Sequence, residues 1–239
     1  HISHLTARVL DFIYPRTCAG CGGAIFTEPG HICWDCMAGL EIVSQPYCSI
    51  CGDPADGMVE HTYRCGPCRK NQPAFDSARS AVRFRGAIKN VLHSFKYNIG
   101  TCLGSDLVPL LDGCVRTSME GTRFDAVTYV PLYSRRERER TYNQSQILAF
   151  SLGKRMGIDY IHSCIARTRD TATQTDLSAT ERKRNVKGAF TVTEPKWVDG
   201  RALLLVDDVM TTGATVNECS RVLREAGARS VHVVTVARG

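Results

Sequence analysis

The chain has 239 residues, of which 43% are apolar and 23% charged, as in an ordinary soluble globular protein. No apolar run approaches the roughly 18 residues that a membrane span requires, and no signal peptide precedes the first cysteines. These features argue against membrane insertion and predict a cytoplasmic protein, in which the twelve cysteines would stay reduced.

The net charge of +6 is unevenly distributed. Residues 1–75 hold five Lys/Arg against seven Asp/Glu, whereas the remaining residues hold 25 against 17. Attraction to a polyanion would therefore belong mainly to the second part of the chain. An ordinary solvated surface explains the same charges equally well.

Four C-x-x-C pairs occupy residues 18–68. This spacing lets both thiolates of a tight turn bind one metal ion, and two such turns complete a tetrahedral site. Glycine follows the second cysteine in CAGCG and CSICG but not in CWDCM or CGPCR. The sequence therefore repeats one unit, a C-x-x-C-G turn followed by a C-x-x-C turn without the glycine. The pattern favours sequential pairing over a cross-braced arrangement. The two expected quartets are Cys18, Cys21, Cys33 and Cys36, and Cys48, Cys51, Cys65 and Cys68.

Two structural Zn²⁺ ions are the expected occupants of these quartets. Disulfides are not expected in the cytoplasm, and a redox role would not need four C-x-x-C pairs. An iron–sulfur cluster remains an alternative, because it also binds four cysteines. His61 could replace a thiolate, but we expect it to be a bystander. The first seventy residues contain few large aliphatics, so metal binding, worth about 10–16 kcal/mol, would supply the folding energy. The isolated cysteines are expected to be small buried apolar residues: Cys102, Cys114, Cys164 and Cys219.

Beyond Pro73 the sequence changes to alternating strands and helices, which divides the chain into a double zinc ribbon (1–72) and an α/β domain (73–239). The alternation in AFDSARSAVRFRG predicts a strand within 74–86. Helical spacing of Ile88, Val91, Leu92 and Phe95 predicts a helix over 87–98. Further strands are expected within 124–132, 202–209 and 230–237, and further helices within 104–114, 141–157 and 215–228. In the helix at 141–157 the apolar positions are Ile147, Leu148, Phe150 and Leu152. This order predicts a parallel sheet covered on both faces.

The stretch LLLVDDVMTTGAT, Leu203–Thr215, combines four aliphatics, two acids and a small-residue loop. In parallel sheets ligands bind beyond the carboxyl ends of the strands. Backbone N–H groups of 211–215 would open the following helix and favour a phosphate, while Asp207 and Asp208 could accept hydrogen bonds from the two hydroxyls of a ribose. Neither GxGxxG nor GxxxxGK[ST] occurs, which disfavours a dinucleotide fold and a Walker loop. An acidic loop that merely ends a core strand is the alternative.

This stretch resembles the phosphoribosyl-pyrophosphate (PRPP) motif of type I phosphoribosyltransferases, a fold that would cover roughly residues 75–239. Together with the cysteine pairs, SFKYN, YVPLYSRRERERTYNQ and TQTDLSATERKRNV, it makes the chain similar to the ComF family. The ComFC members of that family assist DNA uptake in natural transformation. The expected fold is therefore an α/β parallel sheet of the type I phosphoribosyltransferase type with an N-terminal double zinc ribbon.

The resemblance implies binding of PRPP together with Mg²⁺. The ribose and 5-phosphate would meet Asp207, Asp208, Val209, Met210, Thr211, Thr212, Gly213, Ala214 and Thr215. The pyrophosphate loop and its neighbours would be Pro131, Leu132, Tyr133, Ser134, Arg135, Arg140, Asn143 and Gln144. The family usually has glycine where this chain has Thr141. A mobile loop over 169–185, which could equally be a plain surface loop, would include Gln174, Arg182, Lys183, Arg184 and Asn185.

The resemblance implies a PRPP-binding protein that assists the uptake or processing of single-stranded DNA and works with other competence proteins. Whether it turns PRPP over stays open. A non-enzymatic adaptor for single-stranded DNA is the main rival, supported by twelve Lys/Arg against six Asp/Glu in residues 131–190. A nucleobase-salvage phosphoribosyltransferase is the third hypothesis, although the sequence contains no recognisable base-binding element.

Overall fold

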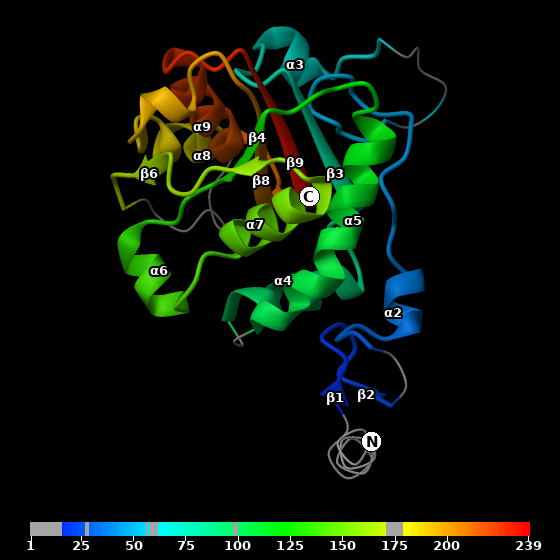
Figure 1. Ribbon diagram of the computed structural model, residues 1–239. Coiled ribbons are helices and arrows are strands. Elements are labelled where there is room, and N and C mark those ends of the chain that lie inside the picture. Colours follow the sequence, from blue (N-terminus) through cyan, green and yellow to red (C-terminus); the bar gives the residue numbers. More distant parts are fainter. Residues whose placement is uncertain (1–15, 27–28, 56, 58–61, 98–99, 171–178) are drawn as a thin grey trace.

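A five-stranded parallel sheet forms the centre of the computed structural model, which describes residues 16–26, 29–55, 57, 62–97, 100–170 and 179–239 (Figure 1). Its strand order is β3-β9-β8-β4-β5, and each neighbouring pair runs parallel. The strands are β3 (Ser77–Arg83), β4 (Ala126–Tyr129), β5 (Asp159–Tyr160), β8 (Ala202–Met210) and β9 (Ser230–Arg238). The expected α/β class is confirmed.

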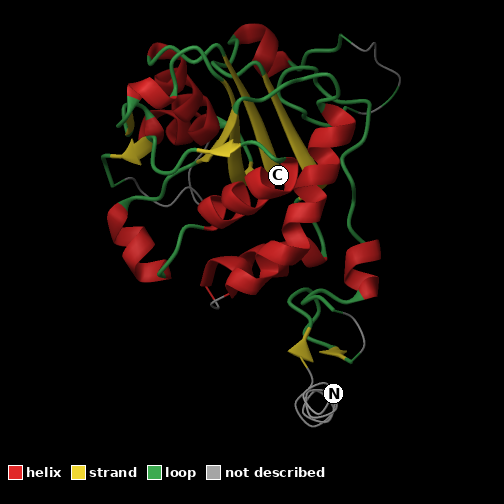
Figure 2. Ribbon diagram, viewed as in Figure 1, coloured by secondary structure: helices red, strands yellow, loops and turns green. Residues whose placement is uncertain are grey.

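The aliphatic run of β8 is buried because helices cover both faces of the sheet (Figure 2). Leu204 and Val206 pack in one core with the helices α4 (Ala87–Tyr97), α5 (Gly104–Ser118) and α7 (Gln144–Met156). Leu203 and Leu205 alternate to the other core, which contains α9 (Ala214–Glu225). Because successive side chains of a strand point to opposite faces, a continuous apolar run is what a doubly covered strand requires.

Smaller elements surround this sheet. The antiparallel pair β6 (Ile165–Arg167) and β7 (Phe190–Val192) lies beside α9, as does α8 (Ala179–Val186). Two short 3₁₀ helices, η1 (Gly100–Leu103) and η3 (Pro195–Trp197), and the helix α6 (Ser134–Arg140) complete the α/β part. None of the described helices is long and apolar enough to cross a lipid bilayer.

Three expectations differ from the structure. Helix α6 was not expected, because SRRERER contains no apolar residue and therefore no apolar period. Phe150 of α7 is 56% exposed, since it lies two residues, or about 200° around the helix, from the buried Leu148. Cys102 is exposed, whereas the other three isolated cysteines are buried as expected.

The two ribbons are attached to different parts of the α/β domain (Figure 1). The first contains β1 (Arg16–Thr17), β2 (Ala24–Ile25) and α2 (Trp34–Ala38), and it lies against α4 and α5. There Asn90 Nδ2 donates to the Gly20 carbonyl at 2.8 Å, and His31 contacts Asp106 at 3.2 Å. The second contains α3 (Gly66–Lys70) and lies at the opposite end of the sheet, near α9.

The segment between the ribbons covers the open edge of the sheet. Its Val43 amide donates to the carbonyl of Ala81 in β3 at 3.0 Å, and the carbonyl of Ile50, in the first turn of the second ribbon, accepts from the Ala78 amide at 2.7 Å. An uncovered edge strand presents unpaired N–H and C=O groups that promote association. The ribbon module therefore stabilises the α/β domain as well as itself.

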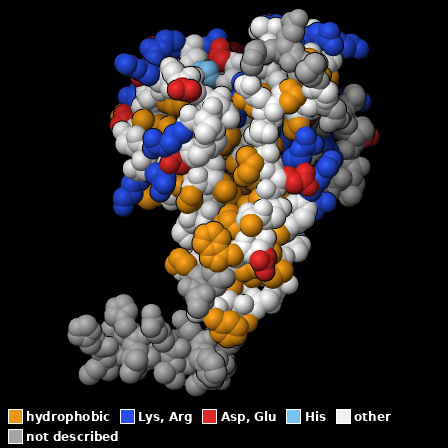
Figure 3. Space-filling model, turned by 90° about the vertical axis from the view of Figure 1, so that its right-hand side faces the viewer, with side chains coloured by type: hydrophobic (Ala, Val, Ile, Leu, Met, Phe, Trp, Pro, Cys, Tyr) orange, Lys and Arg blue, Asp and Glu red, His pale blue; other side chains and the backbone are white. Residues whose placement is uncertain are grey.

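The side of the molecule shown in Figure 3 carries hydrophobic side chains over its lower half, where the first ribbon and α2 lie. The large exposed apolar residues in this region are Phe26, Trp34 and Ile42.

Candidate functional site

The carboxyl ends of β4 and β8 form the rim that holds most of the expected site residues. These two strands are direct neighbours, with Tyr129 aligned with Val206. Asp207 and Asp208 therefore lie close to the chain that leaves β4 at Val130. The expected meeting of the acid pair with residues 131–135 on one edge agrees with this topology.

The two acids differ in their surroundings. Oδ1 of Asp207 accepts a hydrogen bond from the Ser145 hydroxyl at 2.9 Å and another from the Asp208 amide at 2.9 Å. Burial and then the charge of Asp208 raise the pKa of Asp207 to about 7. Asp208 accepts from the Val209 amide at 2.7 Å through Oδ1. The pair is thus held rigidly, and one of its two carboxyls titrates near neutral pH.

Lys96, which we did not assign to the site from the sequence, contacts the acid pair directly. Its Nζ lies 2.8 Å from Oδ2 of Asp208. Burial lowers the pKa of Lys96, but the charge of Asp208 and the hydrogen bond to it outweigh this effect, so that the pKa is raised. The motif SFKYN could have indicated that Lys96 belongs to the site, because it places this lysine at the end of the helix that follows β3.

The end of α4 is held in place by the segment that precedes α7. Gln144 Nε2 donates to the Lys96 carbonyl at 3.3 Å, and Arg140 donates to Gln144 Oε1 at 3.2 Å. Arg140 also donates to the Tyr97 hydroxyl and stacks over its ring. Arg140 and Gln144 thus lie next to Lys96, and the structure connects these two expected residues to the acid pair.

The loop after β8 forms a small cradle lined by Asp207 and residues 209–216. Gly213 has a φ of +73° and is the N-cap of α9, so the N–H groups of the first helical turn open towards the cradle. A Cβ at this position would lie 2.8 Å from Met210 Cε. Unpaired amides and the helix dipole make such a helix start suitable for an anion.

Arg182 and Arg238 support the cradle from outside. Arg182 of α8 donates to the Thr211 hydroxyl at 3.2 Å. Arg238 donates to the carbonyls of Met210 and Thr211, and it forms an ion pair with Asp53 of the second ribbon at 2.9 Å. The second ribbon is therefore linked to the cradle through one arginine.

The expected pyrophosphate loop is shorter than the stretch 131–135. Pro131 and Leu132 precede α6, Tyr133 is its N-cap, and Ser134 and Arg135 already belong to the helix. Arg135 forms an ion pair with Asp170 at 2.8 Å. The chain leaves α6 at Thr141 with a φ of +68°, which explains why glycine suits this position.

The side chain of Asn143 forms hydrogen bonds within the protein and has a structural role. It is buried at the N-cap of α7, accepts from the Ser145 and Gln146 amides, and donates to the Val130 carbonyl at 3.1 Å. By fixing Ser145, it also fixes the hydroxyl that binds Asp207.

Part of the expected mobile loop is helical. Residues 179–186 form α8, which contains Arg182, Lys183, Arg184 and Asn185. Arg169 donates to the carbonyls of Asn185 and Lys187 and closes the base of this segment. Gln174 and His61 lie outside the described residues.

The eight cysteines form the two sequential quartets that the sequence predicts. Within each quartet the sulfur atoms lie within 4.8 Å of one another. Gly22 and Gly52, which follow the second cysteine of their turns, have φ values of +76° and +66°. Burial raises the pKa of Cys18, but backbone N–H donors including Cys33 offset this and lower it to about 6. Four sulfurs at this spacing, some receiving N–H hydrogen bonds, fit two structural zinc ions.

The parallel sheet, the acid pair and cradle at its rim, and the two Cys₄ quartets define a protein with a phosphoribosyltransferase-like domain and a double zinc ribbon. Family models agree: residues 9–69 match the double zinc ribbon domain, and residues 146–239 match the phosphoribosyl transferase domain.

The similar curated proteins identify the family. Competence protein F of Haemophilus influenzae is 32% identical over 225 residues, which cover 92% of this chain and 96% of that protein. DNA utilization protein YhgH of Escherichia coli is 32% identical over 228 residues, or 90% and 99% of the two chains. Competence protein ComFC of Streptococcus pneumoniae is 25% identical over 211 residues, or 87% of each. The chain belongs to the ComF family.

Solved phosphoribosyltransferases are more distant. The adenine phosphoribosyltransferase of Thermoanaerobacter pseudethanolicus is 14% identical with a TM-score of 0.34, covering 70% of this chain and 93% of that one. The glutamine PRPP amidotransferase of B. subtilis is 24% identical with a TM-score of 0.35, covering 63% of this chain and 28% of that one.

Proposed function

We propose that this protein binds PRPP with Mg²⁺ at the β8 rim and assists the handling of single-stranded DNA in natural transformation. The observation that carries the first part is the sequence of groups along one edge: the acid pair, then the cradle at the start of α9. The second part is supported by relatives whose names are competence and DNA utilization proteins.

The acid pair suits a ribose diol. Asp207 accepts its two hydrogen bonds through Oδ1, and no hydrogen bond among the described residues uses its Oδ2. Oδ2 of Asp208 is paired with the Lys96 ammonium group, so the charge of this carboxylate is compensated while a ribose hydroxyl donates to it. The cradle formed by residues 211–215 would hold the 5-phosphate of the same ligand.

The pyrophosphate end of PRPP would face the cations Lys96 and Arg140. The two belong to different elements, yet both are held at the rim by Gln144. A Mg²⁺ ion bound with the ligand would neutralise the pyrophosphate and the nearby carboxylates. If the ligand is turned over, the protein's own part is to hold the ribose and stabilise the charges that develop as pyrophosphate leaves.

A non-enzymatic DNA adaptor is the second candidate, and α6 favours it. This helix has no buried residue and carries Arg135, Arg136, Arg138 and Arg140. Such a helix is suited to phosphate contacts that depend strongly on salt. Incubation of the protein with PRPP, Mg²⁺ and a panel of nucleobases separates the two candidates. Base-dependent release of pyrophosphate supports an enzyme, whereas salt-sensitive DNA binding without release supports an adaptor.

Calorimetric titration with PRPP and Mg²⁺ tests the site itself. Asp207→Ala combined with Asp208→Ala removes the hydroxyl acceptors and should weaken binding a hundredfold or more, since hydrogen bonds to charged groups contribute about 1.5–3 kcal/mol each. Asp159→Ala combined with Glu194→Ala, two exposed carboxylates away from the rim, is the matched control and should bind as the wild type does. Wild-type affinity in the folded Asp207/Asp208 variant would remove the sugar-phosphate proposal.

A further inference from the structure

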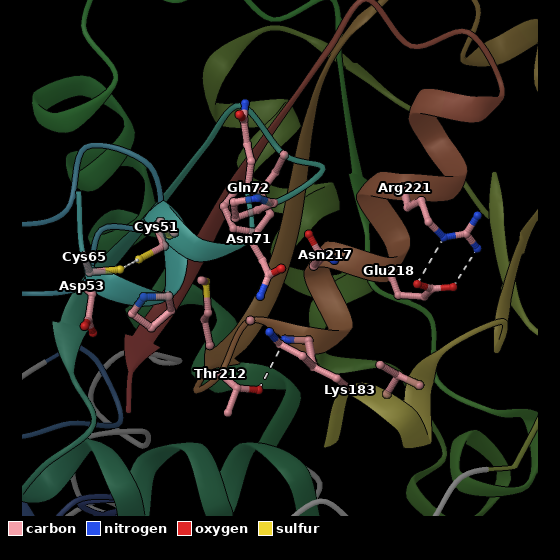
Figure 4. A pocket seen from close by; sticks show the side chains of 18 of the residues that line it. Cys51, Asp53, Cys65, Asn71, Gln72, Lys183, Thr212, Asn217, Glu218 and Arg221 are labelled. Carbon is pink, nitrogen blue, oxygen red and sulfur yellow. Dashed lines mark hydrogen bonds and ion pairs between the residues drawn. The ribbon is translucent and has the colours of Figure 1, made fainter. Parts of the chain in front are cut away.

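A cavity of about 490 Å³ lies between the second zinc ribbon and helix α9 (Figure 4). It adjoins the phosphate cradle and shares the stretch Thr212–Ala214 and Met210 with it. Asp207, Thr211 and Thr215 line the cradle but not this cavity. The cavity is thus a separate space on the ribbon side of the phosphate loop, with a volume typical of small-molecule sites.

The inner surface of the cavity is apolar and comes from several elements. Phe75 follows the ribbon, Val186 ends α8 and Met210 ends β8, and each of the three is at most 4% exposed. Pro67 and Pro73 border the same space from the ribbon side. An apolar group bound here would contact these buried side chains.

Two amide side chains point into the cavity from opposite walls, Asn71 from the ribbon side and Asn217 from α9 (Figure 4). The Oδ1 atom of Asn217 accepts the Ala74 amide at 2.8 Å, which fixes the orientation of the side chain. Its NH₂ group is then available as a donor in a fixed place. Amide groups of this kind recognise the donor and acceptor edge of a nucleobase.

The lining includes three of the expected zinc ligands, Cys51, Cys65 and Cys68, and its other charged side chains form two ion pairs and leave two lysines. Asp53 is paired with Arg238 at 2.9 Å, and Glu218 is paired with Arg221 at 2.7 Å. No salt bridge among the described residues involves Lys183 of α8 or Lys187, which follows the helix directly, and both line the cavity. Lys183 lies at the Thr212 end, beside the phosphate loop (Figure 4). An anion bound at this end would meet a lysine that no salt bridge among the described residues neutralises.

We propose that this cavity binds a nucleoside 5′-phosphate unit, with its base between the ribbon and α9 and its phosphate at Lys183 and Lys187. The apolar lining, the amides of Asn71 and Asn217 and the two lysines correspond to the base faces, the base edge and the phosphate. The unit comes either from a free nucleotide or from a DNA strand, and in the second case the inference rests on the proposed DNA function.

Photo-crosslinking of the full chain tests the proposal. The probes are 5-iodouridine 5′-monophosphate and a short oligodeoxynucleotide that contains 5-iododeoxyuridine, and mass spectrometry locates the crosslinked residue. We expect crosslinks within residues 71–75 or 210–217. Lys183→Gln combined with Lys187→Gln should weaken probe binding about tenfold or more. Lys154→Gln combined with Lys196→Gln, exposed lysines outside the cavity, should leave it unchanged.

The two probes distinguish the sources. Crosslinking of the mononucleotide at these positions supports a free nucleotide, and crosslinking of the oligonucleotide alone supports a strand. Crosslinks elsewhere, no binding of either probe, or full displacement of the probe by ribose 5-phosphate would overturn the proposal. PRPP binding, measured separately by calorimetry, reports on the proposed function, so failure of one is distinct from failure of the other.

Discussion

Lys96 Nζ lies 2.8 Å from Asp208 Oδ2, which joins the end of α4 to the end of β8. In this arrangement one ammonium group offsets two adjacent carboxyls, of which Asp207 already has a raised pKa. A ribose diol that binds the acid pair must share Asp208 with Lys96. The pyrophosphate of the same ligand would then offer the ammonium group a second anionic partner.

Replacement of Lys96 should therefore affect the two ends of PRPP differently. Lys96→Met keeps the length of the side chain and removes its charge. We expect PRPP affinity with Mg²⁺ to fall about tenfold or more, and ribose 5-phosphate, which lacks the pyrophosphate, to lose much less. Calorimetry with both ligands checks this, and Lys96→Arg should restore part of the PRPP affinity. An equal loss for both ligands would mean that Lys96 only orients the acid pair.

The raised pKa of Asp207 predicts a pH-dependent stability. Because this pKa is about 7 in the folded protein and ordinarily 3.8, the folded state holds the proton more tightly. The contribution of Asp207 to stability is therefore greatest below pH 4 and is lost as pH rises to 7.

Asp207→Asn retains an oxygen acceptor for Ser145 and cannot ionise. It should be more stable than the wild type at pH 8, by about 1–4 kcal/mol, and nearly equal to it near pH 4. Denaturant unfolding at both pH values measures the difference, with Asp159→Asn as the exposed control. A gain that is the same at both pH values would contradict a titration effect.

Zinc content tests the two quartets, and their positions predict different consequences. Elemental analysis should give about two zinc equivalents per chain. Cys21→Ser in the first ribbon and Cys51→Ser in the second should each lose one. Only Cys51→Ser should weaken PRPP binding, because Asp53 beside it is paired with Arg238, which holds the Met210 and Thr211 carbonyls. Iron in place of zinc, or equal effects on PRPP, would count against this arrangement.

The basic residues of α8 are predicted to contact single-stranded DNA. Alanine at Arg182, Lys183 and Arg184 should weaken binding and flatten its salt dependence by up to about two log units per log unit of salt, because each lost phosphate contact removes about 0.7. The matched control carries alanine at Arg123, Lys154 and Lys196, which are exposed elsewhere. Fluorescence anisotropy across a salt series measures both. Unchanged affinity at low salt would show that α8 is a solvated surface.

The local chemistry of this protein can be predicted from the sequence. The C-x-x-C turns with their glycines specify both metal quartets, since each turn is formed by neighbouring residues. The order of four aliphatics, two acids and a small-residue loop specifies a buried strand, a polar rim and a helix start, because side-chain alternation and capping act over a few residues. The parallel sheet follows from the alternation of such elements.

Only the tertiary structure decides which distant groups meet. Lys96 reaches Asp208, Asp53 reaches Arg238, and the segment between the ribbons covers the edge of β3. These contacts join residues far apart in the chain, and a single lysine or aspartate has no periodicity that reveals its partner. Helix α6, without an apolar residue, and the exposed Phe150 show the same limit, because burial depends on how the elements pack and not on the residue alone.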